Sequence, residues 1–239
     1  MIEEKILELV KQANPDNPIT FVQDIVKEYS INKMNDYIIS CQECTSCTCN
    51  KKSIGVGNPN ASVLILGESP EKEFMDSIDK IGKPFSYGSE KYLFDILNAL
   101  NVDTDEIFYM NSVQCFLSTA TGDKRLPSVN ERERCKTFVD YAIETIKPIL
   151  IIALGGVAIN NLNEEIGKKK VTNIRGNMFF YKGIRVMPTF NPSIFKLWEI
   201  RDTYPKEYIE ENMYNFYFDI EKAFNYVQDN YNINVFKNN

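Results

Sequence analysis

Cysteines are the first residues in this chain whose type and spacing could do chemistry. Cys44 and Cys47 form a C-x-x-C pair, and Cys115 and Cys135 follow far along the chain. A close pair of thiolates joined by two distant ones can supply four ligands to one iron–sulfur cluster or to one zinc ion. The spacing therefore predicts a metal or cluster site built from separate segments.

Polar motifs follow three predicted strands and form a second candidate site. Gly67-Glu68-Ser69-Pro70 comes after an apolar run over 62–66, Asn111 follows a run over 107–110, and Asn191-Pro192-Ser193 follows the last strand. Each motif alone is typical of a turn or a helix cap. In parallel sheets, ligands bind at the carboxyl ends of the strands, so three such motifs together indicate a binding or active site.

Apolar periodicity predicts alternating strands and helices to carry these residues. Besides the two strands above, we expect a strand over 149–153 and two more within 171–190. Helices are expected over 1–40, from Ser89 to about 100, from a Ser128–Glu131 capping box to about 146, after Gly155-Gly156, and over 206–228. This alternation is typical of an α/β fold with a mainly parallel sheet covered on both faces.

The composition indicates one large globular domain. The chain has 239 residues, of which 44% are hydrophobic, and its longest apolar run, 149–159, is too short and too broken by glycine to span a bilayer. The acidic, amphipathic start is unlike a secretory signal, so we expect a reducing cytoplasm, where six cysteines favour metal binding over disulfides. Since there is no histidine, the usual general base and imidazole ligand are excluded.

The formal net charge of −6 argues against a broadly basic coat for nucleic acid. It does not exclude DNA, because only the surface that faces the phosphates needs to be positive. Basic residues cluster locally, for example at Lys124-Arg125 and Lys168-Lys169-Lys170. Each cluster taken alone is expected to be solvated surface.

Taken in order, these motifs resemble the iron–sulfur branch (the family-four type) of the uracil-DNA glycosylase superfamily. The resemblance runs from about Cys44 to about Phe195 and rests on eight elements: Cys44/Cys47, Gly67-Glu68-Ser69-Pro70, Gly82-Lys83-Pro84-Phe85, Asn111/Cys115, Cys135, Leu154-Gly155, Arg175-Gly176 and Asn191-Pro192-Ser193. It implies a three-layer α/β/α sandwich over residues 41–239, with 1–40 as a helical extension. It also implies a monofunctional glycosylase that flips uracil out of DNA and hydrolyses its N-glycosidic bond, leaving an abasic site.

The resemblance assigns the reacting groups. Glu68 would stabilise the sugar cation and orient the attacking water. Asn191 would donate a hydrogen bond to uracil O2 as the base departs. Asn111 would select uracil, because its amide nitrogen can donate to O4 while its oxygen accepts from N3–H.

Further contacts are expected around these groups. Phe85 would stack on the flipped base. The remaining contacts implied by the resemblance are Ser69 and Ser193 with the substrate, Arg175 and Lys196 with DNA, and Phe195 as a wedge in the DNA.

Two positions depart from the family pattern. Asn191 stands where the family has the histidine of H-P-S, although the same Asn-Pro-Ser triplet resembles the second motif of the mismatch-specific uracil/thymine glycosylases. A weaker donor at this position is expected to slow the reaction by ~10²–10³. Glu71 stands where the family usually has glycine, so it would crowd the 5-position of the base or lie on the surface.

Alignment with the family selects four thiolates as ligands of a structural [4Fe–4S] cluster: Cys44, Cys47, Cys115 and Cys135. Cys41 and Cys49, in the same loop as the first pair, are left spare. A zinc ion on the same four thiolates is the alternative. Either group would tie the loop before the first strand to the segment that holds Asn111.

Two other functions stay open. A glycosylase fold without catalysis could serve as a DNA-binding replication accessory protein or decoy, which the missing histidine and residues 1–40 favour. An electron-transfer iron–sulfur protein would explain the cysteines but not the strand-end motifs. In the glycosylase interpretation we expect a cytoplasmic, nucleoid-associated monomer that binds uracil-containing DNA and no membrane, with a replication or repair partner at residues 1–40.

Overall fold

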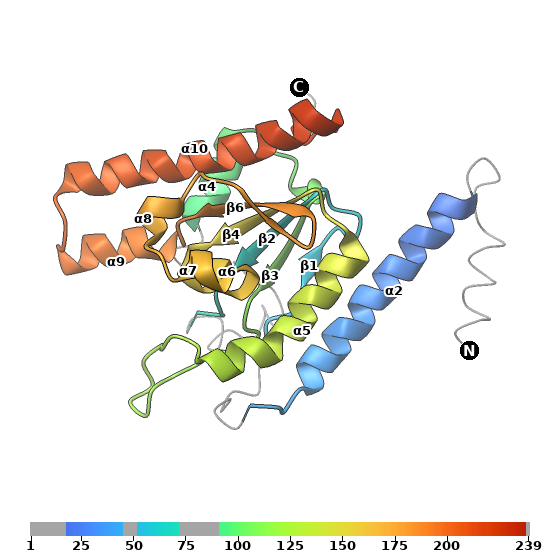
Figure 1. Cartoon of the computed structure of the whole chain (residues 1–239), viewed down its shortest axis with the longest axis horizontal. Helices are drawn as coiled ribbons and strands as arrows, with labels where there is room; N and C mark the ends of the chain where they lie inside the picture. The colour runs from blue at the N-terminus through green and yellow to red at the C-terminus, as the bar shows by residue number, and fades with distance from the viewer. Residues whose placement is uncertain (1–17, 45–51, 72–90, 238–239) are drawn as a thin grey trace.

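The computed structural model describes residues 18–44, 52–71 and 91–237, which form an α/β structure around one sheet. The strands lie in the order β1-β3-β2-β4-β6-β5 (Figure 1). Their bounds are β1 Val56–Gly57, β2 Val63–Gly67, β3 Ile107–Asn111, β4 Leu150–Leu154, β5 Phe179–Tyr181 and β6 Ile184–Thr189. β3, β2, β4 and β6 are parallel and the edge strands β1 and β5 pair antiparallel, so the predicted mainly parallel sheet is confirmed.

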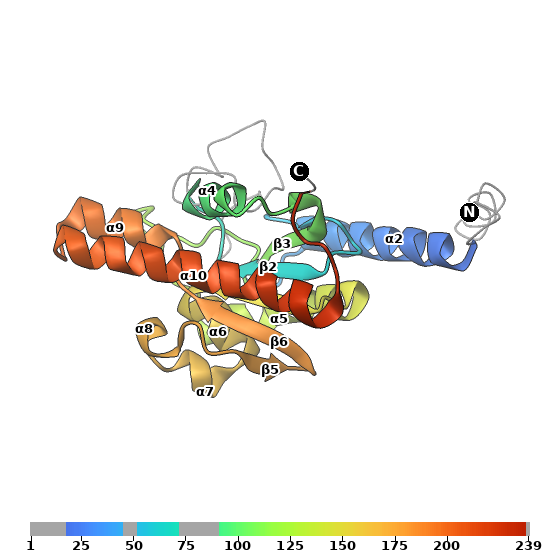
Figure 2. The same cartoon turned by 90° about the horizontal axis from the view of Figure 1, so that it is seen from above.

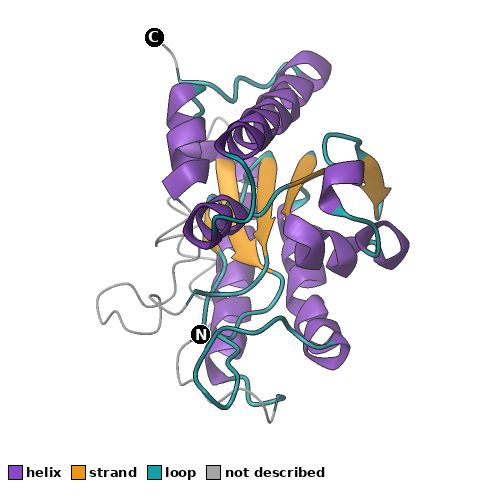
Figure 3. Cartoon of the chain, turned by 90° about the vertical axis from the view of Figure 1, so that its left-hand side faces the viewer, coloured by secondary structure: helices purple, strands orange, loops and turns teal. Residues whose placement is uncertain are grey.

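Helices cover both faces of this sheet, as Figures 2 and 3 show. The described helices are α2 Pro18–Ser40, α4 Lys91–Ala99, the 3₁₀ turn η2 Thr104–Glu106, α5 Val129–Ile146, α6 Gly155–Leu162, α7 Glu164–Gly167, α8 Val171–Ile174, α9 Ser193–Arg201 and α10 Lys206–Tyr231. The predicted capping box opens α5. The sequence interpretation missed α9 and the short β1, α7 and α8, and residues 1–17 of the expected N-terminal helices lie outside the described residues.

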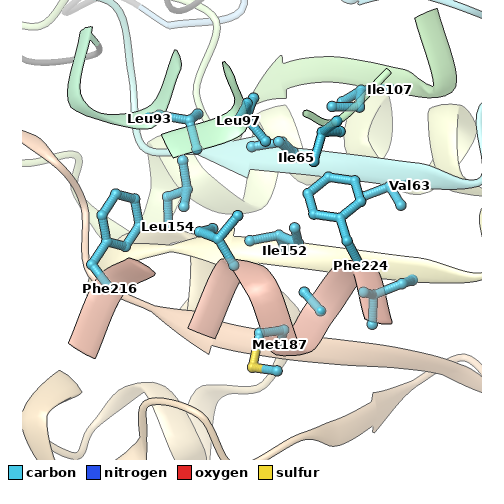
Figure 4. Close-up of a cluster of buried hydrophobic side chains, with 14 of the residues drawn as sticks. Val63, Ile65, Leu93, Leu97, Ile107, Ile152, Leu154, Met187, Phe216 and Phe224 are labelled. Carbon is cyan, nitrogen blue, oxygen red and sulfur yellow. The ribbon is translucent and has the colours of Figure 1, made fainter. Parts of the chain in front are cut away.

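Alternation along β2 explains how one sheet builds two cores. Val63 and Ile65 belong to a core on the side of α4 and α10, where Phe216 and Phe224 are also buried (Figure 4). Leu64 and Leu66 point to the opposite face of the sheet and belong to a second core with α2, α5 and α6. All five residues of β2 are buried, as expected for a parallel strand covered on both faces.

Helix α2 is part of the second core. Ile31, Met34 and Ile38 are buried there. Asn35 exchanges two hydrogen bonds with the backbone of Gly55: its Nδ2 donates to the carbonyl at 2.8 Å, and the Gly55 N–H donates to its Oδ1 at 3.0 Å. The described part of α2 therefore braces the segment just before β1. None of the described helices is long and apolar enough to cross a membrane.

Candidate active site

Sheet register brings the predicted strand-end residues to one edge of the sheet. Gly67, the last residue of β2, pairs with Asn111, the last residue of β3. Glu68 follows at once, and its carbonyl accepts the N–H of Val113 at 2.9 Å, which fixes the loop after β2 against the loop after β3. Asn191 follows β6, which lies two places from β2 in the sheet. The carboxyl ends thus gather a carboxylate and two amides, as the sequence predicted.

A close approach of two loops holds Asn191. Gly155 has a φ of +82°, and a Cβ on it would lie 2.7 Å from Asn191 Cβ, so glycine is required after β4. Asn191 Oδ1 accepts the N–H of Ser193 at 3.1 Å. Because this backbone donor must face the amide oxygen, the amide nitrogen points the other way and can donate to a ligand. Asn191 is therefore oriented as a hydrogen-bond donor.

Glu68 is a largely buried carboxylate, and among the described residues it pairs with one lysine. Its side chain is 14% exposed, and Lys124 Nζ lies 3.6 Å from its Oε1. Burial raises the pKa of Glu68 above its ordinary value, while the Lys124 ammonium opposes this rise and the Glu71 carboxylate adds to it. Lys124 lies closer to Glu71, at 2.7 Å. Glu71, the departure from the family glycine, is thus ion-paired beside the candidate catalytic carboxylate.

The loop that carries Lys124 is anchored to the start of α5. Arg125 Nη1 and Nη2 donate to the two carboxylate oxygens of Glu131 at 2.9 and 2.7 Å. Glu131 Oε2 also accepts the N–H and the hydroxyl of Ser128, which caps the helix. These donors, Arg125 first, lower the pKa of Glu131 to about 2. Lys124 and Arg125 were expected to be solvated surface; instead Lys124 contacts two carboxylates and Arg125 holds the loop.

Asn111 is 2% exposed, and its Nδ2 donates to Ser53 Oγ at 3.1 Å. An amide nitrogen has two hydrogens, so the second can still serve a base carbonyl. Ser53 comes from the segment between α2 and β1, and no motif in the sequence pointed to it. Ser69 is also buried, and its Oγ has no hydrogen-bond partner among the described residues. A buried hydroxyl without a partner fits a ligand contact, as predicted for Ser69.

One cleft of about 1010 Å³ joins Glu68 to Asn191 and extends along α9. The described residues that line it include five cations and two carboxylates: Lys124, Arg125, Lys170, Lys196 and Arg201 against Glu68 and Glu71. The whole chain has the opposite balance, with 27 Lys and Arg against 33 Asp and Glu. The cleft is therefore a local positive surface on an acidic protein, as binding to a phosphate backbone requires.

The structure corrects two expected DNA contacts and leaves others in place. The Phe195 side chain is fully buried among aromatic rings of the first core, so it packs the fold and does not project as a wedge. Arg175 Nε and Nη2 donate to the carboxylate of Asp219, and Nη2 also donates to a backbone carbonyl of α10, so its guanidinium is committed inside the protein. Lys196 and Ser193 line the cleft. Phe85 lies outside the described residues.

Thiols gather around a second, smaller cavity of about 80 Å³. Its lining includes Cys44, Cys115 and Cys135, three of the predicted ligands, together with Cys41. Lys52, 8% exposed, lines it as well and favours negative charge beside it. Cys47 and Cys49 lie outside the described residues. Among the residues that are described, no three Cys, Asp or Glu side chains converge closely enough to hold a metal ion. The donor chemistry fits a thiolate-bound cluster or zinc.

Comparison with known proteins identifies relatives of this chain. The sequence model of the Uracil DNA glycosylase superfamily matches residues 54–211. A type-4 uracil-DNA glycosylase of Thermotoga maritima is 30% identical over 158 residues, 64% of this chain and 77% of the relative. One from Sulfurisphaera tokodaii is 27% identical over 172 residues, 69% of this chain and 74% of the relative. A DNA polymerase of Bacillus phage SP01 is 26% identical over 145 residues, which are 58% of this chain but 14% of the polymerase. The chain therefore belongs to the uracil-DNA glycosylase superfamily, and its relatives include members of the type-4 branch that its motifs resemble.

Proposed function

We propose that this protein hydrolyses the N-glycosidic bond of uracil in DNA and leaves an abasic site. The observation that carries the proposal is a single positive cleft with Glu68 at the end of one strand and the Asn191 amide at the end of another. The relatives named type-4 uracil-DNA glycosylase support the same reaction.

In this mechanism the two residues act on opposite charges. As the bond breaks, positive charge develops on the sugar, and ionised Glu68 stabilises it and orients the attacking water. Negative charge develops on the uracil ring, and Asn191 Nδ2 donates to O2. Burial strengthens both interactions, because the cleft excludes part of the solvent. Asn111 selects the base through its amide, and Ser69 and Ser193 make further contacts with the substrate.

A thiolate-bound [4Fe–4S] cluster on Cys44, Cys47, Cys115 and Cys135 would support this site without taking part in the reaction. When bound, the cluster would link the segment before β1, which holds Cys44 and Cys47, to the segment after β3 and to α5, which hold Cys115 and Cys135. The segment after β3 follows Asn111 directly, so the cluster would steady the residue that selects the base. Anaerobic purification should give a brown protein with about four iron atoms per chain. A colourless protein with one zinc per chain would replace the cluster by the metal alternative.

The decisive experiment is a uracil-release assay on a uracil-containing single strand and on U:G and U:A duplexes, with alkali to reveal abasic sites. We expect release without added metal or nucleotide, with U:G faster than U:A because a mismatched base is easier to unstack. Glu68→Gln should lower the rate by about 10³-fold and leave DNA affinity unchanged. The matched control is Glu211→Gln, an exposed carboxylate of α10 outside the cleft, which should behave as wild type.

A second candidate function is a DNA-binding replication accessory protein whose pocket no longer cleaves. The match to a phage DNA polymerase favours a replication context. Asn191→His separates the candidates, because restoring the stronger donor should raise the rate by about tenfold or more if the site is active. If wild type and this variant both bind DNA but release no uracil from any substrate, the accessory function takes the place of the enzyme. The replication or repair partner at residues 1–40 and the monomeric state remain predictions.

A further inference from the structure

The outer part of the cleft has an aromatic wall. Beyond Asn191 and Ser193, the cleft runs along α9 to Trp198, Tyr204 and Tyr208. The rings of Tyr204 and Tyr208 stack with centroids 4.6 Å apart and planes 27° apart, and Trp198 meets Tyr204 edge-on at 5.1 Å. Tyr204 is 39% exposed. The rings support one another, so an exposed aromatic face is already in place before any ligand binds.

Three cations accompany this wall. Lys196 and Arg201 on α9 and Lys170 just before α8 are exposed and line the same cleft. None of the three forms an ion pair with the side chains that the structure describes. Among the described residues, the two carboxylates that line the cleft, Glu68 and Glu71, both contact Lys124 at its inner part. In the described part of the chain, the outer part of the cleft therefore combines aromatic faces with cations that no ion pair neutralises.

The cleft has room for more than one base. Its volume of about 1010 Å³ lies at the upper end of pockets that enclose whole drug-sized ligands. α9 and α10 lie side by side, joined through the segment that holds Tyr204, and extend beyond the sheet (Figure 1). This helix pair presents the aromatic wall next to the site of the reaction.

We propose that the outer part of the cleft is a stacking subsite for an unpaired nucleotide next to the flipped uracil. Aromatic rings beside Lys and Arg are the chemistry that binds single-stranded nucleic acid: bases stack on the rings, and the cations neutralise the phosphates. The proposal rests on the proposed function for the inner part. Because a neighbouring base can stack here only when it is unpaired, single-stranded or locally melted DNA is the preferred substrate.

Trp198 makes this subsite directly observable. It is the only tryptophan of the chain, and it lines the cleft. Titration with a uracil-free oligothymidylate should quench its fluorescence as a base stacks nearby. An oligomer of equal length made of abasic spacers keeps the phosphates but has no bases. We expect it to bind wild type about tenfold more weakly than oligothymidylate.

Tyr204→Ala tests the stacking surface itself. This variant should lose about tenfold in affinity for oligothymidylate and nothing for the abasic oligomer. Tyr204→Phe keeps the ring and should behave as wild type, which separates stacking from a folding defect. Tyr214→Ala is the matched control, since Tyr214 is 67% exposed on α10 and lies outside the cleft lining. In kinetics, Tyr204→Ala should raise KM for single-stranded substrate and leave KM for duplex unchanged.

Two results separate this inference from the proposed function. Equal affinity for the two oligomers, or no effect of Tyr204→Ala, overturns the subsite even if uracil is released. Base-dependent quenching that Tyr204→Ala removes supports the subsite even if no uracil is released, in which case the glycosylase proposal fails alone.

Discussion

Two buried carboxylates, Asp219 in the fold and Glu68 in the cleft, meet their cations in different ways. Asp219 is 3% exposed, and both its oxygens accept hydrogen bonds from Arg175, with a further one from Thr189 Oγ1 at 2.7 Å. Glu68 is 14% exposed and has Lys124 at 3.6 Å, while Lys124 itself lies nearer to Glu71. Asp219 is thus saturated by donors, whereas the charge of Glu68 is only partly compensated.

The difference shows what separates a structural ion pair from a reactive group. Both carboxylates are removed from most of the solvent, so burial alone does not distinguish them. A carboxylate held by a planar guanidinium and a hydroxyl has its acceptor sites occupied and stabilises one geometry. A carboxylate paired with one ammonium, which a second carboxylate shares, can still accept a hydrogen bond from water or interact with developing charge. Variants at the two sites should therefore fail in different ways.

The largest expected effect is on stability, from Arg175→Ala. This change leaves the Asp219 carboxylate buried without its main partner, so the free energy of unfolding should fall by ~3 kcal/mol. Urea unfolding measures it, and Lys206→Ala, which breaks an exposed pair with Glu210, should change little. If the variant kept its stability and lost affinity for DNA, Arg175 would contact DNA as first expected. Its pair with Asp219 would then not be a structural ion pair.

Lys124→Met should move the pH dependence of kcat/KM. Glu68 acts ionised, and activity falls as the pH drops through its pKa, which burial already raises. Removing the ammonium that opposes this rise lifts the pKa further, so the acidic limb moves to higher pH. Near the limb, the rate should fall about 3- to 10-fold. Lys124→Arg keeps the charge and should keep the limb. A uniform loss at all pH values would mean that Lys124 acts on binding only.

Glu71→Gln should shift the same limb in the opposite direction and by less. The Glu71 carboxylate raises the pKa of Glu68, so a neutral glutamine removes that repulsion. Lys124 then has Glu68 as the one carboxylate left of the two that it contacts. The acidic limb then moves to lower pH, by a smaller amount than Lys124→Met moves it upward. A change confined to KM for 5-substituted uracils would instead show that Glu71 crowds the base.

The smallest expected effect is a gain in stability for Glu68→Gln at neutral pH. The folded-state pKa of Glu68 is raised above its unfolded value, so this group favours folding below the unfolded pKa and loses that contribution as the pH rises through the folded pKa. At neutral pH the buried charge is a cost that glutamine removes. Urea unfolding at neutral and at acid pH should show the gain only at neutral pH. A loss at neutral pH would make Glu68 a structural carboxylate like Asp219.

Much of the fold and the inner site could be predicted from the sequence. The apolar run before Glu68 and the run before Asn111 predicted buried strands of a mainly parallel sheet, and neighbouring parallel strands end at one edge of that sheet. The capping box at Ser128 marked the start of α5 because both its side chains are local to the first turn. Local patterns of this kind carry their structural meaning within a few residues.

Residues whose role depends on a distant partner could not be predicted. Arg175 was expected to contact DNA, but its partner Asp219 lies 44 residues away on α10, and no local pattern links the two positions. Phe195 follows the Asn-Pro-Ser motif like a surface wedge, yet α9 turns it into the first core. The contacts of Lys124 could not be predicted, because the course of its loop is set by the pairing of Arg125 with Glu131.

That pairing of Arg125 with Glu131 gives the protein an anchor that resists acid. A carboxylate whose pKa is lowered to about 2 contributes fully to folding above its unfolded pKa, and this contribution declines progressively until the pH falls through about 2, where the carboxylate takes up its proton. Across the range in which Glu68 takes up its proton, the loop that carries Lys124 stays tied to α5. Acidification can therefore silence the chemistry of the cleft while its wall stays in place. The protein could be loaded with intact substrate in mild acid and started by raising the pH.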